Sequence, residues 1–61
     1  MDKREFFEEI LGKVCEMTEL SREKVCKSNL EECVDARYVV IAVLSKRLSD
    51  KQIAEVSGWS V

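Results

Sequence analysis

Seven consecutive apolar residues near the middle of the chain, Tyr38 to Leu44, constrain the fold most strongly. In a chain of only 61 residues such a run belongs to the centre of the hydrophobic core. Its length fits either a buried strand or the buried part of a helix. The helical phase of the residues before it, and the lack of a second strand-like segment to pair with, favour a helix from Leu30 to about Leu48. We expect this central helix to be packed on several sides.

Two capping signals lie before the central helix. Asp2, in an Asp-x-x-Glu pattern, places a carboxylate at the N-terminus of a helix over about residues 2–17. Ser21 predicts the N-cap of a second helix at about Arg22–Lys27, which is too short to be stable without tertiary contacts. Ser28-Asn29 then offers a break in the chain and a cap for the central helix.

The two glycines have different positions in these predicted elements. Gly12 lies inside the first helix, where it marks either a close approach to another backbone or a point weakened by up to about 1 kcal/mol relative to alanine. Gly58 stops a last helix, which a capping box from Ser49 to Gln52 begins. The expected fold class is therefore all-α: a single domain over residues 1–61, built as a small bundle of about four helices.

Composition argues against several classes of function. The chain has no histidine, so we expect no enzyme, no cofactor and no small-molecule substrate. No apolar run approaches the length of a membrane span and the N-terminus lacks a signal peptide's apolar stretch, which predicts a cytoplasmic protein without membrane contact. Cys15, Cys26 and Cys33 are expected to be reduced, partly buried and without metal; a three-thiolate metal site or a redox switch is the alternative.

The C-terminal end of the chain has the pattern of the first helix and turn of a helix-turn-helix. Ala54 is small enough to let a second helix cross closely, and Gly58 permits the positive φ that the turn needs. Ile53 is the inward anchor of this unit. Trp59 would pack under the second helix and Ser60 would begin it, but the sequence stops one residue later. We therefore expect an incomplete helix-turn-helix.

Together with the central helix, this segment resembles a known family. The stretches 33–44 and 48–58 are similar to the C-terminal DNA-binding domain of the bacterial replication initiator DnaA, and to small DnaA-like proteins of bacterial mobile elements. The resemblance covers about residues 20–61. It implies a helix-turn-helix module that binds double-stranded DNA and is truncated before the recognition helix, the element that contacts base edges.

The resemblance also implies which residues contact DNA. Arg37 matches the arginine that meets the phosphate backbone at the start of the family's long helix, and Lys27 matches the first position of a basic loop that enters the minor groove. Ser60 matches the start of the recognition helix. Lys46 and Lys51 flank the turn where a helix-turn-helix touches phosphates. The loop after Lys27 carries acidic residues where the family has arginine and lysine.

Several of these residues have structural explanations as well. Arg37 can pair on the surface with the carboxylates that precede it. Lys46, Arg47 and Lys51 can be explained by a helix C-terminus, where the dipole favours cations. Trp59 is either a plug of the core or an exposed apolar anchor for another chain.

The charge distribution supports a second hypothesis. Residues 1–35 carry six basic and ten acidic side chains, whereas residues 36–61 carry four basic and two acidic ones. A DNA-binding module usually has a basic balance, and the net charge of this chain is −2. The alternative function is therefore a protein-interaction or self-associating helical module without nucleic-acid binding, with a homodimer formed through the apolar surface near Trp59.

Overall fold

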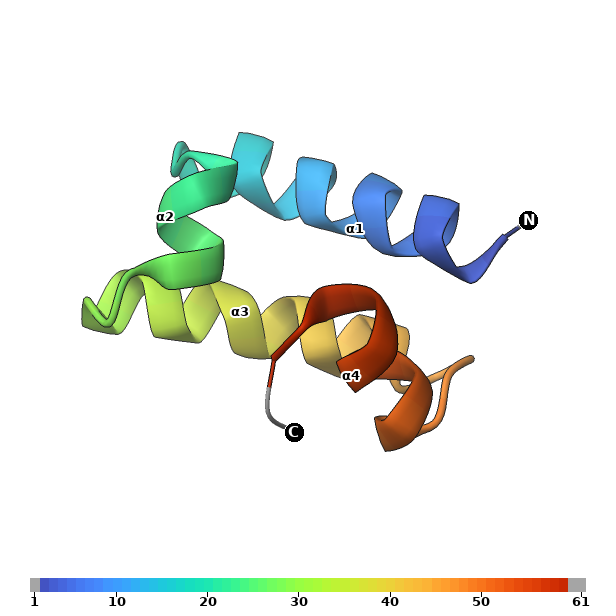
Figure 1. The fold of residues 1–61 in the computed structure, drawn as a ribbon. Helices are drawn as coiled ribbons and strands as arrows, with labels where there is room; N and C mark the ends of the chain where they lie inside the picture. Colours follow the sequence, from blue (N-terminus) through green and yellow to red (C-terminus); the bar gives the residue numbers. More distant parts are fainter. Residues whose placement is uncertain (1, 60–61) are drawn as a thin grey trace.

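The computed structural model describes residues 2–59, and within that range it contains four α-helices and no β-strand (Figure 1). The helices are α1 (Lys3–Thr18), α2 (Arg22–Lys27), α3 (Glu31–Leu44) and α4 (Asp50–Ser57). The predicted all-α fold class, a small helical bundle, is confirmed. None of these helices combines the length and the hydropathy that crossing a bilayer requires.

The helices form a compact arrangement around one long pair. α1 and α3 lie alongside each other in opposite directions, and α2 closes one end of the pair by packing on both (Figure 1). α4 packs against α1 near the other end. Within residues 2–59, no other helix covers the side of α3 that faces away from α1 and α2.

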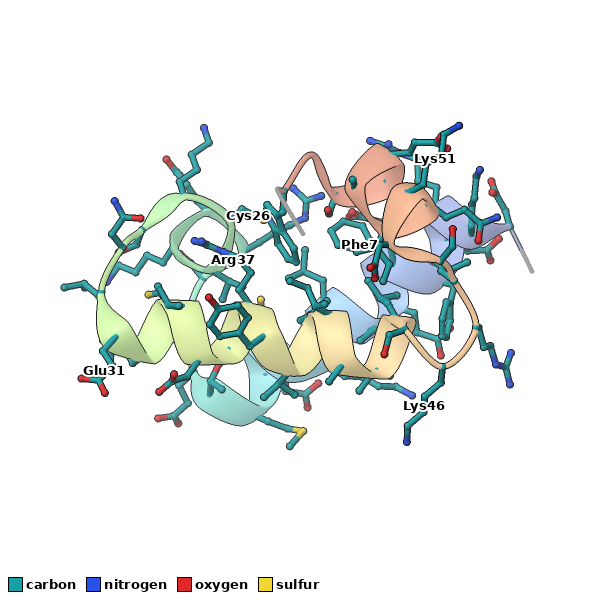
Figure 2. All side chains as sticks on the ribbon, turned by 90° about the horizontal axis from the view of Figure 1, so that it is seen from below. Phe7, Cys26, Glu31, Arg37, Lys46 and Lys51 are labelled. Atoms are coloured by element: carbon teal, nitrogen blue, oxygen red, sulfur yellow. The ribbon has the colours of Figure 1, made fainter. Side chains whose placement is uncertain are left out.

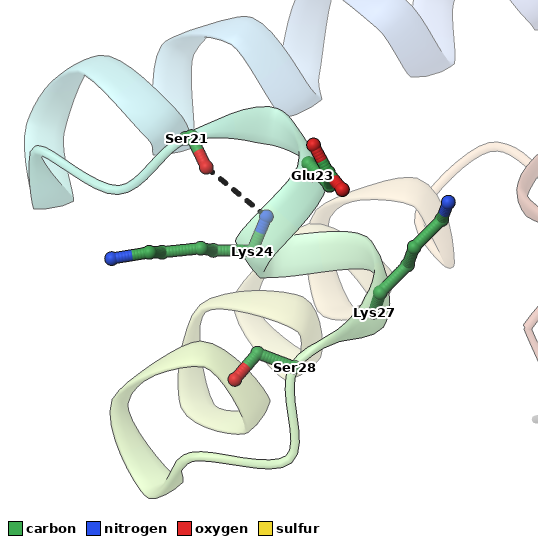
Figure 3. Close-up of a pocket in the computed structure, with 5 residues that line it drawn as sticks. All are labelled: Ser21, Glu23, Lys24, Lys27 and Ser28. Carbon is green, nitrogen blue, oxygen red and sulfur yellow. Dashed lines mark hydrogen bonds between the residues drawn. The ribbon is translucent and has the colours of Figure 1, made fainter.

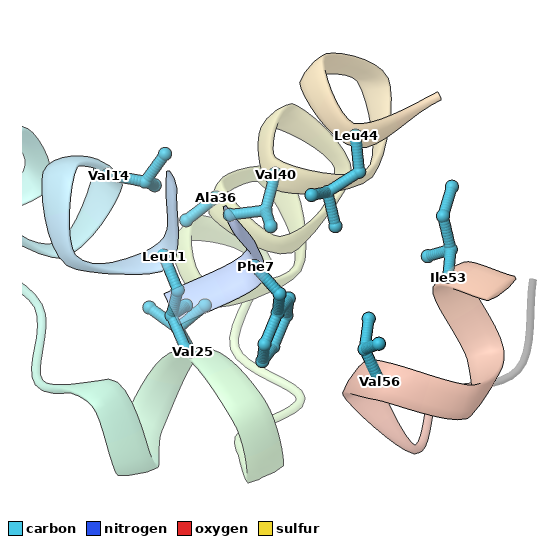
Figure 4. Packing of buried hydrophobic residues seen from close by; sticks show 9 residues of the cluster. All are labelled: Phe7, Leu11, Val14, Val25, Ala36, Val40, Leu44, Ile53 and Val56. Atoms are coloured by element: carbon cyan, nitrogen blue, oxygen red, sulfur yellow. The ribbon is translucent and has the colours of Figure 1, made fainter. Parts of the chain in front are cut away.

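The core lies between α1 and α3 and receives side chains from all four helices (Figure 4). Its buried members are Phe7, Leu11, Val14, Val25, Ala36, Val40, Leu44, Ile53 and Val56. Two of them, Ile53 and Val56, are the buried residues of α4. The attachment of α4 to the rest of the fold therefore depends on very few side chains.

Three of the predicted caps are confirmed. Asp2 and Ser21 each accept a backbone N–H from the first turn of the helix that follows, at 3.2 and 3.1 Å. Ser49 and Gln52 form the reciprocal capping box, in which each side chain accepts the other residue's backbone N–H. These caps satisfy backbone donors that have no partner inside the helix.

The cap predicted for the central helix is wrong. Ser28 Oγ accepts the backbone N–H of Leu30 at 3.2 Å, so this hydroxyl closes a turn in the loop instead of capping α3. Leu30 is the N-cap residue and makes no side-chain cap hydrogen bond. The acidic side chains of Glu31 and Glu32 in the first turn favour the helix through its dipole.

α3 ends at Leu44 and not at the predicted Leu48. Ser45 Oγ donates to the carbonyl of Ala42 at 2.8 Å. The carbonyl of Leu44 accepts the N–H groups of both Arg47 and Leu48, which tightens the chain into a turn. A serine hydroxyl that bonds a carbonyl of the preceding turn competes with the backbone hydrogen bonds that would continue the helix. The pattern of apolar residues gives no information about this hydrogen bond.

The central apolar run is also less buried than predicted. Val40 and Leu44 are fully buried, but Tyr38 and Val39 are 63% and 51% exposed. A helix can bury one face against one layer of neighbours, and consecutive residues point in all directions around it. The outer face of α3 therefore carries apolar side chains that the fold leaves uncovered.

The two glycines differ as their positions in the chain suggested, with one correction. A Cβ added to Gly12 would meet no atom within 4 Å, so the close approach to another backbone is wrong. Gly58 has φ 77°, and its N–H donates to the carbonyl of Ala54 at 2.8 Å, which ends α4. Only Gly58 needs the conformational freedom of glycine.

Opposite stability changes follow for the two alanine substitutions. We expect Gly12→Ala to raise the free energy of unfolding by about 0.5–1 kcal/mol, because it removes the backbone entropy cost of an exposed helical glycine. We expect Gly58→Ala to lower it by about 1–2 kcal/mol, because alanine is strained at positive φ. Urea denaturation followed by circular dichroism measures both, and changes of the same sign would contradict the geometry described here.

Candidate nucleic-acid interface

Arg37 joins α2 to α3. Its Nε donates to the carbonyl of Val25 at 3.0 Å, and its Nη2 donates to the carbonyl of Ser28 at 2.9 Å. These acceptors lie at the C-terminal end of α2, where backbone carbonyls lack partners within the helix. The guanidinium carbon lies 5.7 Å from the centre of the Trp59 ring, within cation–π range. The partners of Arg37 are thus backbone carbonyls and an aromatic ring, and not the carboxylates that precede it in the sequence.

Trp59 packs on the core beside this arginine. Its ring meets that of Phe7 edge to face, with 5.5 Å between the centroids and 75° between the planes. Its backbone N–H donates to Ser57 Oγ at 3.0 Å. The side chain is half-buried against the hydrophobic cluster. Of the two explanations for Trp59, these contacts support the core plug.

The remaining residues predicted to form a helix-turn-helix scaffold lie on α4 and at its end. Ile53 is fully buried and Ala54 is half-buried. Gly58 has the left-handed backbone that a turn after the first helix of such a unit requires. Ser60, the predicted start of the recognition helix, lies outside the described residues, as does Val61.

Lys46 and Lys51 flank the turn between α3 and α4, and both are exposed. Neither forms an ion pair with any other residue in the range 2–59. Figure 2 places them on opposite sides of this end of the molecule. Lys51 lies in the first turn of α4, where the helix dipole disfavours a cation, so the dipole does not explain it. Arg47 lies with its guanidinium carbon 5.4 Å from the centre of the Phe6 ring.

Lys27 is the last residue of α2 and lines a shallow surface pocket of about 440 Å³ (Figure 3). The residues that line this pocket are Ser21, Glu23, Lys24, Lys27 and Ser28. Lys24 and Lys27 are three residues apart on a helix, and this spacing is the sequence signal by which Lys24 could have been added to the candidate cations. Glu23 lowers the positive potential of the pocket.

The cysteines are free thiols in the structure. Cys33 is buried, whereas Cys15 and Cys26 are half-buried. Burial raises the pKa of the Cys15 thiol above its ordinary value, the neighbouring Cys26 raises it further, and Arg22 partly offsets both. A raised pKa keeps this thiol protonated and weakly nucleophilic at neutral pH. Within residues 2–59 no group of three metal-ligating side chains is close enough together to hold an ion.

An apolar groove runs between α1 and α3. It has a volume of about 320 Å³ and is lined by Ile10, Lys13, Val14, Met17, Thr18, Val39 and Val43. Met17 is 81% exposed at its edge. The sequence feature that corresponds to this groove is the central apolar run, to which Val39 and Val43 belong. The other three helices described cannot cover every side of so long a run.

The chain was compared with protein-family models, with curated proteins and with solved structures, and none of them matches it. The similarity to the DnaA domain thus depends on the residues of this sequence alone. Membership of that family stays a prediction.

Proposed function

We propose that this chain is a DNA-binding helix-turn-helix module of DnaA-like type. The observation that carries the proposal is α4 with its flanking turns. The helix is capped by Ser49, anchored by the fully buried Ile53 and ended by Gly58 at positive φ. Lys46 and Lys51, which form no ion pair with another residue of the range 2–59, lie on both sides of the turn before it.

The proposed contacts are with phosphates and not with bases. Lys27, Lys46 and Lys51 are exposed cations that can approach a duplex. Arg37 already donates to two backbone carbonyls, so the proposal assigns it the positioning of α2 and not a phosphate contact. The net charge of −2 opposes binding. We therefore expect weak affinity without sequence preference, and a slope of log affinity against log salt of about −2 to −3.

An amide NMR titration with a mixed-sequence duplex tests this proposal. At about 50 mM salt we expect shifts that cluster around the three lysines, and at about 200 mM salt we expect most of them to vanish. Lys51→Gln should reduce the magnitude of the salt slope by about one unit, since one phosphate contact is lost. Lys3→Gln is the matched control because Lys3 is paired with Glu55 at 3.3 Å. The control should leave the slope unchanged.

The absence of shifts at a large excess of duplex and low salt would reject DNA binding by this chain. Equal effects of Lys51→Gln and Lys3→Gln would show that only net charge matters, and would reject the proposed contacts while leaving non-specific attraction.

The second candidate function is a protein-interaction module, and the apolar groove between α1 and α3 favours it. Met17 and Val39 are exposed apolar side chains that line this groove, and the exposed Tyr38 precedes Val39 in the chain. Trp59 is half-buried against Phe7, so this surface replaces the one near Trp59 as the candidate for association. The same NMR samples without DNA distinguish the two functions, because association shifts the amides of α1 and α3 as the protein concentration rises.

A further inference from the structure

Four exposed residues of α3 and one residue of the turn that follows it are spaced along the outer face of this helix. Their spacing alternates between three and four residues, which keeps side chains on one face of a helix. This line, the α3 outer stripe, consists of Glu32, Asp35, Val39, Ala42 and Lys46. No other helix in residues 2–59 covers it.

The stripe is continuous with apolar surface. Val39 and Ala42 form its centre, and Val39 also lines the groove between α1 and α3. Tyr38, 63% exposed, lies beside Val39 on the outer side of the helix. Contiguous exposed apolar surface bordered by charged residues is typical of an interaction site.

Charge at the two ends of the stripe limits what can cover it. Glu32 and Asp35 lie at the N-terminal end of the stripe and Lys46 at its C-terminal end. Figure 2 labels Glu31, which precedes Glu32, and Lys46, and shows them at opposite ends of α3. Val39 is the midpoint, seven residues from both Glu32 and Lys46. At a rise of 1.5 Å per residue, Glu32 is about 10.5 Å from the centre. Lys46 lies beyond the other end of α3, in the turn where its N–H donates to the carbonyl of Val43.

These positions are self-complementary when two copies pair in opposite directions. A twofold axis through Val39 places Lys46 of each copy opposite Glu32 of the other copy. Asp35 lies about 4.5 Å along the helix from Glu32, so both carboxylates are near this lysine. A parallel pair would instead place acid against acid and lysine against lysine. The centre of the antiparallel arrangement is Val39 against Val39, with Ala42 small enough to allow close helix packing.

We infer that the α3 outer stripe is a docking surface for a second copy of this chain, in an antiparallel twofold dimer centred on Val39. The inference does not depend on DNA binding. The surface is small, so the dimer belongs to the weak and transient class of interfaces. The dissociation constant expected for such a contact is on the order of 0.1 mM.

Sedimentation equilibrium of the full chain from about 10 µM to about 1 mM, without DNA, measures this association. Val39→Glu should weaken the dimer by more than about tenfold, because it places two carboxylates at the axis. Leu30→Glu is the matched control: Leu30 is 57% exposed and lies at the N-cap of α3, outside the stripe. The control should leave association unchanged, and far-UV circular dichroism should show equal helix content for both variants.

Charge reversal tests the direction of pairing. Glu32→Lys and Lys46→Glu should each weaken self-association by about tenfold. An equimolar mixture of the two should associate at least as tightly as the unmodified chain, because every opposed pair is again of unlike charge. Lys51→Glu changes the net charge as much as Lys46→Glu but lies on α4, and it should have little effect.

A chain that stays monomeric at about 1 mM overturns the inference, because even a weak dimer is populated at that concentration. Equal loss from Val39→Glu and Leu30→Glu overturns the assigned surface. Failure of the mixture to recover association overturns the antiparallel pairing. None of these outcomes bears on binding to a duplex, so the DNA proposal fails or stands separately.

Discussion

Replacing Arg37 with methionine is expected to lower the free energy of unfolding by about 2–4 kcal/mol. The substitution keeps an apolar stem but removes the donors to the carbonyls of Val25 and Ser28. Both hydrogen bonds are partly buried, and each comes from a charged donor, so the loss leaves acceptors without their partner. The contact with the Trp59 ring is lost as well. Urea denaturation followed by far-UV circular dichroism measures the change.

A second arginine supplies the control. Arg22 donates to a carboxylate oxygen of Glu8 at 2.8 Å, but its side chain is 59% exposed. Exposed ion pairs stabilise proteins by less than about 1 kcal/mol, so Arg22→Met should have a small effect. Arg37→Lys should fall in between, because it keeps the charge and loses the two-pronged geometry. If Arg37→Met is as mild as Arg22→Met, Arg37 does not hold α2 against α3.

The Arg37 variants also bear on the DNA proposal. An arginine that contacts phosphate can be replaced without loss of stability, whereas one that joins two helices cannot. Comparing the stability and the salt dependence of DNA binding in Arg37→Lys separates the two roles. We expect the stability to change and the salt slope to stay the same.

Replacing Ile53 with alanine should destabilise the fold by about 2–5 kcal/mol. Ile53 is fully buried and, with Val56, is one of the two buried residues that attach α4 to the core. Since domains of this size are rarely stabilised by more than about 3–5 kcal/mol, a large part of the variant should be unfolded. Thermal denaturation by circular dichroism and the dispersion of amide NMR signals both report this.

Val39→Ala is the control for this substitution. It removes atoms from a β-branched side chain that is 51% exposed, so the change in stability should stay within about 0.5 kcal/mol. A loss below about 1 kcal/mol for Ile53→Ala would mean that α4 unfolds on its own and is not part of the cooperative unit. Amide hydrogen exchange in α4 would then be fast even in the unmodified chain.

Local signals in the sequence predicted the helices well where capping is decided by neighbouring residues. Ser21 and the Ser49–Gln52 box bond to backbone groups only a few residues away, so their geometry follows from the sequence nearby. The end of the central helix was predicted too late. The Ser45 hydroxyl donates to the carbonyl of Ala42, and the chain turns there. An apolar pattern contains no information about a side-chain hydrogen bond that competes with the helix.

The candidate site was less predictable than the fold. The family resemblance singled out Arg37, with the preceding carboxylates as its expected partners otherwise, but its partners are carbonyls at the end of α2 that approach only when the helices pack. The number of exposed cations could be counted from the sequence, whereas their separation in space could not. Lys46 and Lys51 are five residues apart in the chain and lie on opposite sides of the molecule.

By itself, the sequence determined the helical class, the positions of most caps and the glycine that ends α4, because these depend on interactions within one or two turns. Only the tertiary structure decided which side of α3 is buried. α1 and α2 cover one face and α4 packs on α1, so Val40 is fully buried while its neighbour Val39 is half exposed. Adjacent residues on a helix differ by about 100° in direction, and the arrangement of the other helices determines which of them reaches solvent.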